Sequence, residues 1–102
     1  MFPRPALLHL WPILCLLLAA CASAPPVQEM SDARQAIMAA EQADADQYAP
    51  TTLTDARRYL AEAEQLLRDE AYGPARMNAV RAKNRAVRAL AIAQSAAESG
   101  RD

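Results

Sequence analysis

The chain has 102 residues, of which 53% are hydrophobic but only 5% are aromatic, and its formal net charge is −1. That length allows at most one small domain. The near-neutral charge gives no basic excess of the kind that indicates nucleic-acid binding, and two glycines are too few for a turn-rich β-sandwich.

The first twenty residues have the pattern of a secretory signal peptide. Fifteen of them are hydrophobic, and Arg4 is the only charged side chain. A short positive start, an apolar run over residues 7–18 and small residues after it are the three parts of such a signal. The run is shorter than the about 20 residues that a permanent membrane-spanning helix needs. We therefore expect residues 1–20 to be removed.

The sequence Leu18-Ala19-Ala20-Cys21 resembles the lipobox of bacterial lipoproteins. In that class the cysteine thiol receives a diacylglyceryl group, the bond before the cysteine is cut, and the new amino group is acylated. We therefore expect Cys21 to carry the lipid, with several acyl chains (palmitate among them) giving a stable anchor. The alternative is an ordinary signal peptide that is cut at Ala22-Ser23-Ala24. Ala22, where Asp would favour the inner membrane, indicates by resemblance a Gram-negative outer membrane.

The residues that follow, 21–102, predict a helical chain. They include 39 hydrophobic residues, of which 22 are alanine, the residue with the highest helix propensity. No segment has the β-branched alternation that predicts a strand. Residues 21–30 contain Pro25-Pro26 and predict a lipidated N-terminus with an extended tether. Residues 31–98 predict an Ala-rich helical domain, and residues 99–102 a C-terminal tail.

Three amphipathic helices are predicted, at about 31–46, 50–70 and 74–98. Each has one apolar stripe at spacings of three and four residues. In the last helix the stripe comprises Ala75, Ala79, Ala82, Ala86, Leu90, Ala93 and Ala97. Because the connections are short, neighbouring helices should be antiparallel. The predicted fold is therefore all-α, an up-down-up three-helix bundle with a thin core.

Four residues mark the ends of the predicted helices. Ser31 is a candidate N-cap. Pro50 and Pro74 suit the first position of a helix, where the missing N–H is not needed. Gly100 suits the position just after the last helix.

Charge is segregated along the chain. The last predicted helix carries five basic side chains against Glu98 alone, whereas the first two helices are net acidic. Arg81, Arg85 and Arg88 share one face, and like charges at these spacings repel. An anionic group should therefore face these three arginines. It is either the acidic helices of the same chain or an external anion, such as lipid phosphate or an acidic envelope protein.

A second candidate surface is the strip formed by Tyr59 and Leu66, which are seven residues apart on the second predicted helix. A domain this small, with a core made mostly of alanine, is expected to be marginally stable. We therefore expect the chain to self-associate or to dock on a partner through an exposed apolar strip of this kind.

Candidate catalytic, cofactor and metal sites are not found in the sequence. Removal of residues 1–20 takes the only histidine, and lipidation of Cys21 takes the last thiol, which excludes Cys–His and Ser–His arrangements. Glu41, Asp44 and Asp46 form an acidic cluster, but it lacks the glycine-containing turn and the ligand number of a Ca²⁺ loop. We expect neither an enzyme nor a nucleic-acid partner.

The start Tyr48-Ala49-Pro50, followed by Leu53 and Ala56-Arg57 and by the later alanine series, resembles the family DUF4398. The resemblance covers residues 33–97. It implies a small Ala-rich helical domain of Gram-negative envelopes, often lipid-anchored, and brings no established active site. Some members precede a peptidoglycan-binding domain. No such domain is found before Asp102, so peptidoglycan binding is not expected to carry over.

We therefore expect a non-enzymatic interaction or structural module of the cell envelope, anchored by its lipid at the periplasmic face of the outer membrane. Its partners would be the membrane and an envelope protein or a second copy. The alternative is a protein that handles lipids or other amphiphiles by opening its helices around an acyl chain. A large pocket lined by Leu and Met would favour that alternative, and a solid alanine seam would favour the module.

Overall fold

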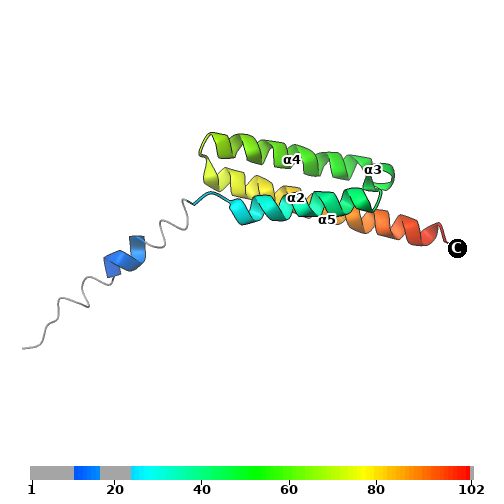
Figure 1. Ribbon diagram of the computed structural model, residues 1–102, viewed down its shortest axis with the longest axis horizontal. Coiled ribbons are helices and arrows are strands. Elements are labelled where there is room, and N and C mark those ends of the chain that lie inside the picture. Colours follow the sequence, from blue (N-terminus) through cyan, green and yellow to red (C-terminus); the bar gives the residue numbers. More distant parts are fainter. Residues whose placement is uncertain (1–10, 17–23, 102) are drawn as a thin grey trace, which may run out of the picture.

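The computed structural model describes residues 11–16 and 24–101 (Figure 1). Residues 11–16 form a short helical segment. The other helices are α2 (Val27–Gln42), α3 (Ala45–Tyr48), α4 (Pro50–Arg68) and α5 (Tyr72–Ser99). No strand occurs in the described ranges, and the all-α prediction is confirmed. Cys21 and most of the predicted signal peptide lie outside the described residues.

Helix α5, with 28 residues, is the central element. Helices α2 and α4 each pack along α5, whereas they contact one another much less. Figure 1 shows α4 running against the direction of α2 and α5, with α3 between α2 and α4 at one end. None of the helices in the described ranges has the length and apolarity to cross a membrane.

Alanine forms most of the core. Six alanines of α5 are completely buried: Ala75, Ala79, Ala82, Ala86, Ala89 and Ala93. Because an alanine side chain is a single methyl group, helices can approach one another closely along such a seam. The largest fully buried side chains in the described chain are Met30, Leu53 and Pro26. The core is therefore thin and depends on a few large residues.

The first long helix begins earlier than predicted. Helix α2 starts at Val27, so residues 27–30 are helical rather than part of a tether, and Ser31 lies inside the helix instead of capping it. Met30 explains the difference, because its side chain is 2% exposed and belongs to a core cluster with Ala63 and Ala79. Burial of this large apolar side chain stabilises a helical conformation for residues 27–30.

The predicted helix over residues 31–46 is interrupted. Asp44 has φ 62°, in the left-handed region that commonly ends a helix. The short α3 follows. Its first residue, Ala45, and the residue directly after it, Ala49, are both buried in the core. Pro50 occupies the first turn of α4 as predicted. Helix α5 starts at Tyr72, two residues before Pro74, and the proline is tolerated in this first turn because its N–H is not needed there.

The turn between α4 and α5 uses a glutamate where glycine is preferred. Glu70 has φ 60°. The backbone N–H of Glu70 donates to the Leu67 carbonyl at 3.0 Å, and the N–H of Ala71 donates to the Leu66 carbonyl at 2.9 Å. These two bonds define a Schellman motif, whose left-handed position usually holds glycine. Gly100 directly follows α5, as predicted, and its φ of −74° is right-handed.

Candidate functional site

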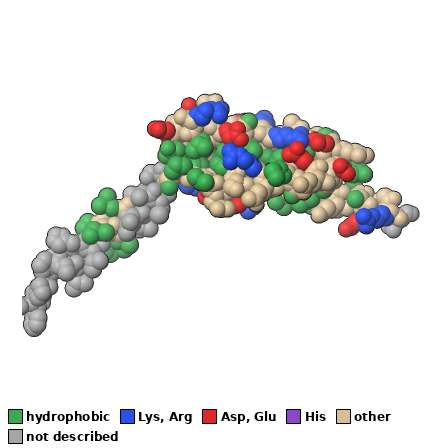
Figure 2. All heavy atoms as spheres, viewed as in Figure 1, with side chains coloured by type: hydrophobic (Ala, Val, Ile, Leu, Met, Phe, Trp, Pro, Cys, Tyr) green, Lys and Arg blue, Asp and Glu red, His purple; other side chains and the backbone are tan. Residues whose placement is uncertain are grey.

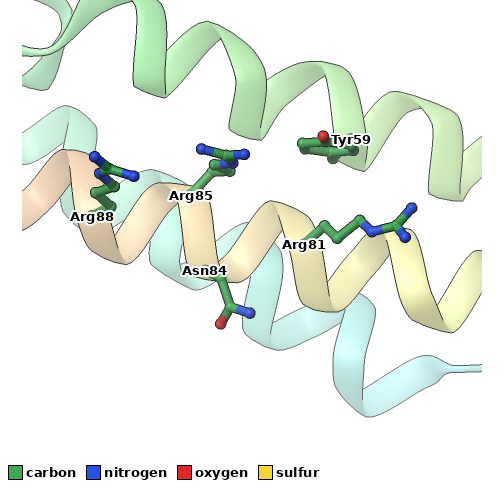
Figure 3. Close-up of a pocket in the computed structure, with 5 residues that line it drawn as sticks. All are labelled: Tyr59, Arg81, Asn84, Arg85 and Arg88. Atoms are coloured by element: carbon green, nitrogen blue, oxygen red, sulfur yellow. The ribbon is translucent and has the colours of Figure 1, made fainter.

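The candidate site lies between α4 and α5. Arg81, Asn84, Arg85 and Arg88 of α5 and Tyr59 of α4 line a pocket of about 400 Å³ (Figure 3). We call this pocket the basic groove. The structure therefore brings together all three predicted anion-facing arginines and one of the two residues predicted for an apolar strip.

The side chains of the basic groove come from two facing helices. Figure 3 shows Arg85 and Arg88 extending from α5 toward α4, and the ring of Tyr59 extending from α4 toward α5. Arg81 extends along α5, and Asn84 points away from α4. Arg85 and Tyr59 are half-buried, whereas the other three side chains are exposed. Helix α2 lies behind α5 in this view, so the groove opens on the side of α5 that α2 does not cover.

The three arginines of the basic groove have no acidic partner within residues 24–101. The ion pairs there involve four other arginines: Arg34, Arg57, Arg58 and Arg76. Figure 2 shows basic and acidic side chains interspersed on one face of the molecule. The acidic helices of the same chain were one of the two predicted partners, and in the described structure they do not pair with the groove.

The two carboxylates of α4 that are nearest to Tyr59 in the sequence pair with Arg58 and not with the arginines of the groove. Asp55 and Glu62 lie four residues before and three residues after Tyr59, on the same side of α4. The Arg58 guanidinium pairs with Asp55 at 3.4 Å and with Glu62 at 3.5 Å. It also lies 4.8 Å from the centre of the Tyr59 ring. The hydrogen bond to Asp55 is the largest cause of the raised pKa of Arg58.

Arg57 joins three helices on another face. Its guanidinium lies 3.3 Å from Glu41 of α2 and 3.1 Å from Asp46 of α3. These two carboxylates raise the pKa of Arg57, with the hydrogen bond to Asp46 contributing most. Two members of the predicted acidic cluster are thus engaged by an arginine. The described residues hold no group of three His, Cys, Asp or Glu side chains that could bind a metal ion.

Arg76 fixes the start of α2 on α5. Its Nε donates to Glu29 at 3.1 Å, and its Nη2 donates to the backbone carbonyl of Ala24 at 3.0 Å. Both side chains of this ion pair are about one-third exposed. The contact holds the segment that precedes α2 against the bundle.

Comparison with known protein families identifies the domain. The family model described as "Domain of unknown function (DUF4398)" matches residues 28–101, which include α3, α4, α5 and nearly all of α2. The chain belongs to the DUF4398 family. Neither the curated proteins nor the solved structures give a significant match. The resemblance to DUF4398 noted in the sequence is therefore confirmed, and all five residues of the basic groove lie within the matched DUF4398 domain.

The chemistry of the groove suits the binding of an anion. Guanidinium groups bind carboxylate or phosphate oxygens with two parallel hydrogen bonds. The pocket volume lies within the about 300–1,000 Å³ typical of ligand sites, but such sites are usually lined by apolar side chains. In this DUF4398 domain the lining is polar apart from one tyrosine ring, which favours a charged group at the surface over a buried apolar ligand.

Sequence reasoning placed some groove residues correctly and missed others. Leu66 is half-buried and does not line the groove, so Tyr59 is the one residue of the predicted apolar strip that belongs to the groove. Asn84 was not predicted. It occupies the same solvent-facing side of α5 as exposed Val80 and Val87. Their spacing of three and four residues was a signal for a second face on this DUF4398 helix, in addition to the alanine stripe.

Proposed function

We propose that this DUF4398 domain is a lipid-anchored, non-enzymatic interaction module at the periplasmic face of a bacterial outer membrane. The observation that carries the proposal is the basic groove. Its three arginines lie on successive turns of α5 and pair with no acidic side chain of residues 24–101. Like charges at these spacings repel, so an anionic partner in the groove stabilises the arrangement.

Lipidation of Cys21 supplies the anchor in this proposal. Five residues, 22–26, separate Cys21 from the start of α2. Five extended residues reach at most about 18 Å, so the domain would be held close to the membrane surface. Arg76 supports this geometry because its bonds to Glu29 and Ala24 keep the preceding segment folded against α5.

The packing supports an interaction module over a protein that handles amphiphiles. In the proposal α2, α4 and α5 act as a single three-helix bundle. Its centre is filled by completely buried alanines, and its pocket is lined by three arginines, an asparagine and a tyrosine. A binding site for an acyl chain needs apolar lining by residues such as Leu and Met. The seam and the groove therefore favour binding at the surface.

Photocrosslinking in intact cells tests the interaction role. A photoreactive amino acid at Asn84, an exposed residue that lines the groove, is expected to give discrete crosslinked products, and Arg85→Ala is expected to reduce them strongly. The same amino acid at Gln47, exposed on α3, is the control and should give none of these products. Equal products from both positions, or none from Asn84, would contradict the proposal.

Palmitate labelling tests the anchor. Cys21→Ser should abolish incorporation of labelled palmitate, because lipidation needs the thiol. Cys15→Ser is the matched control, since Cys15 belongs to the segment that is expected to be removed. Labelling that persists in the Cys21→Ser chain would refute the assignment of the anchor.

A further inference from the structure

The solvent-facing side of α5 carries a second apolar stripe, away from its buried alanines. Met77, Val80 and Val87 have exposed fractions of 56%, 41% and 50%. Asn84 and Ala91 are exposed in the same row. These five residues follow one another at spacings of three, four, three and four, so they share one face of the helix. We call them the outer stripe of α5.

The spacing of the outer stripe is that of a coiled-coil seam. Residues at alternating spacings of three and four occupy the a and d positions, against which another helix packs. From Met77 to Ala91 the stripe covers about 21 Å at 1.5 Å per residue. This length matches two heptads of a single partner helix. Asn84 lies at a central seam position, where a polar residue fixes the register of pairing helices.

The charged side chains that flank the outer stripe are all basic. Arg81 and Arg88 each follow a valine of the stripe, and Lys83 precedes Asn84. Residues 72–97 of α5 contain no acidic side chain. In a coiled coil the positions beside the seam form ion pairs between helices and select the partner. A second copy of α5 would bring cations against cations, whereas a helix with acidic flanks complements them.

A bilayer surface fits this face less well than a helix does. Helices that lie in a membrane interface insert bulky residues such as Leu, Phe and Trp. The outer stripe offers one methionine, two valines, an alanine and an asparagine. Tyr59 and Arg85 are half-buried in the basic groove. Projecting side chains of a helix can enter such a groove more readily than a flat surface can.

We propose that α5 docks an acidic amphipathic helix of a partner protein. The apolar residues of that helix pack on the outer stripe, and its carboxylates pair with the arginines of the basic groove. Arg58 keeps the groove open for them by holding Asp55 and Glu62 of α4. This inference rests on the proposed function, because it names the class of partner that the groove binds.

Fluorescence anisotropy with the full chain in nonionic detergent tests this inference. The probe is a labelled peptide of about three heptads with Leu at the a and d positions and Glu at the flanking positions. We expect saturable binding that weakens as salt is raised. The same peptide with Lys in place of Glu should bind at least about tenfold more weakly. Equal binding of the two peptides, or no binding of the acidic one, overturns the inference.

Matched variants locate the docking surface. Arg81→Ala with Arg88→Ala removes two cations from the groove and should weaken binding about tenfold, whereas Arg34→Ala with Arg68→Ala removes two cations elsewhere and should change it less than about twofold. Val87→Asp should also abolish binding. Met38→Asp is its control, because the two side chains are 50% and 55% exposed and lie on different helices. Equal effects of the matched variants overturn the inference.

Two further measurements separate this inference from the proposed function. The first measures binding of the same chain to vesicles of phosphatidylglycerol. If the chain binds the vesicles but not the acidic peptide, and the Arg81→Ala, Arg88→Ala variant loses this binding, the groove binds a membrane and the inference is overturned. Crosslinks from Asn84 in cells that persist when the acidic peptide fails to bind leave the proposed function standing and refute the helical partner. If the acidic peptide does not bind and Asn84 also gives no crosslinks in cells, both the helical partner and the proposed function are contradicted.

Discussion

Leu53→Ala should destabilise the domain severely. Leu53 is 0% exposed and belongs to the larger core cluster, where most of its neighbours are alanines. Removing three buried carbons costs about 2.4 kcal/mol at about 0.8 kcal/mol per CH₂ group. The cavity adds to this, and measured Leu→Ala losses in a well-studied core span about 2.7–5.0 kcal/mol. Because neighbouring methyl groups cannot extend into the hole, we expect a loss of about 4 kcal/mol.

That loss is large relative to the stability of a domain of this size. At about 0.05–0.15 kcal/mol per residue, residues 24–101 would have a free energy of unfolding of about 4–12 kcal/mol. Urea unfolding followed by circular dichroism at 222 nm measures the change. We expect the urea concentration at the midpoint of unfolding to fall sharply in Leu53→Ala. If the original free energy of unfolding is near the lower end of this range, the variant will be largely unfolded in water.

Val87→Ala is the control for this experiment. Its side chain is 50% exposed, so the same measurement should change by less than about 0.5 kcal/mol. A Leu53→Ala loss below about 1.5 kcal/mol would refute the reasoning. It would mean that the helices move to close the cavity, and that the alanine seam does not hold them at a fixed separation.

Three further variants test the contacts at helix ends. Arg57→Ala should lower the free energy of unfolding by less than about 1 kcal/mol in urea titrations, because its ion pairs are exposed; a larger loss would contradict this. Glu70→Gly should stabilise the domain by up to about 1 kcal/mol, because glycine adopts φ 60° without strain, while Glu64→Gly inside α4 should destabilise it by about as much. Arg76→Ala should speed hydrogen exchange at the Met30 amide, and unchanged exchange would show that this arginine does not hold the start of α2.

The helices were predictable because alanine spacing and proline positions are local signals. The predicted stripe of the last helix agrees with the buried residues from Ala75 to Ala86. It then departs, because Ala89 is buried where Leu90 was expected, and Leu90 is half-buried. The buried residues keep alternating steps of four and three residues through Ala89 and Ala93, whereas the predicted stripe took two successive steps of four from Ala82 to Leu90. Both series are compatible with the 3.6 residues of a helical turn, and packing against α2 and α4 decides between them.

The boundaries depended on tertiary contacts that the sequence does not display. Met30 belongs to a region that the Pro25-Pro26 pair made look extended, and its burial between α4 and α5 extends α2. The break at Asp44 has no glycine or proline to announce it. Residues other than glycine adopt positive φ when the surrounding structure compensates for the strain, and that compensation is not a local property of the chain.

The groove was predicted in part. The spacing of Arg81, Arg85 and Arg88 was sufficient to place them on one face. Whether they paired with acidic helices depended on how those helices were rotated. Arg58 holds the two nearest carboxylates of α4 within their own helix, and this choice between local and cross-helix pairing is decided only by the folded arrangement.

The alanine seam also shapes how stability responds to temperature. A buried alanine loses no side-chain entropy on folding, unlike Leu or Met, so the seam of α5 forms without that opposing term. It also removes little apolar surface from water, and exposure of apolar surface is what gives unfolding its large heat capacity. A domain held together by methyl groups should therefore have a flatter stability curve than a leucine-rich bundle of equal length. Its marginal stability would change little between cold and warm surroundings.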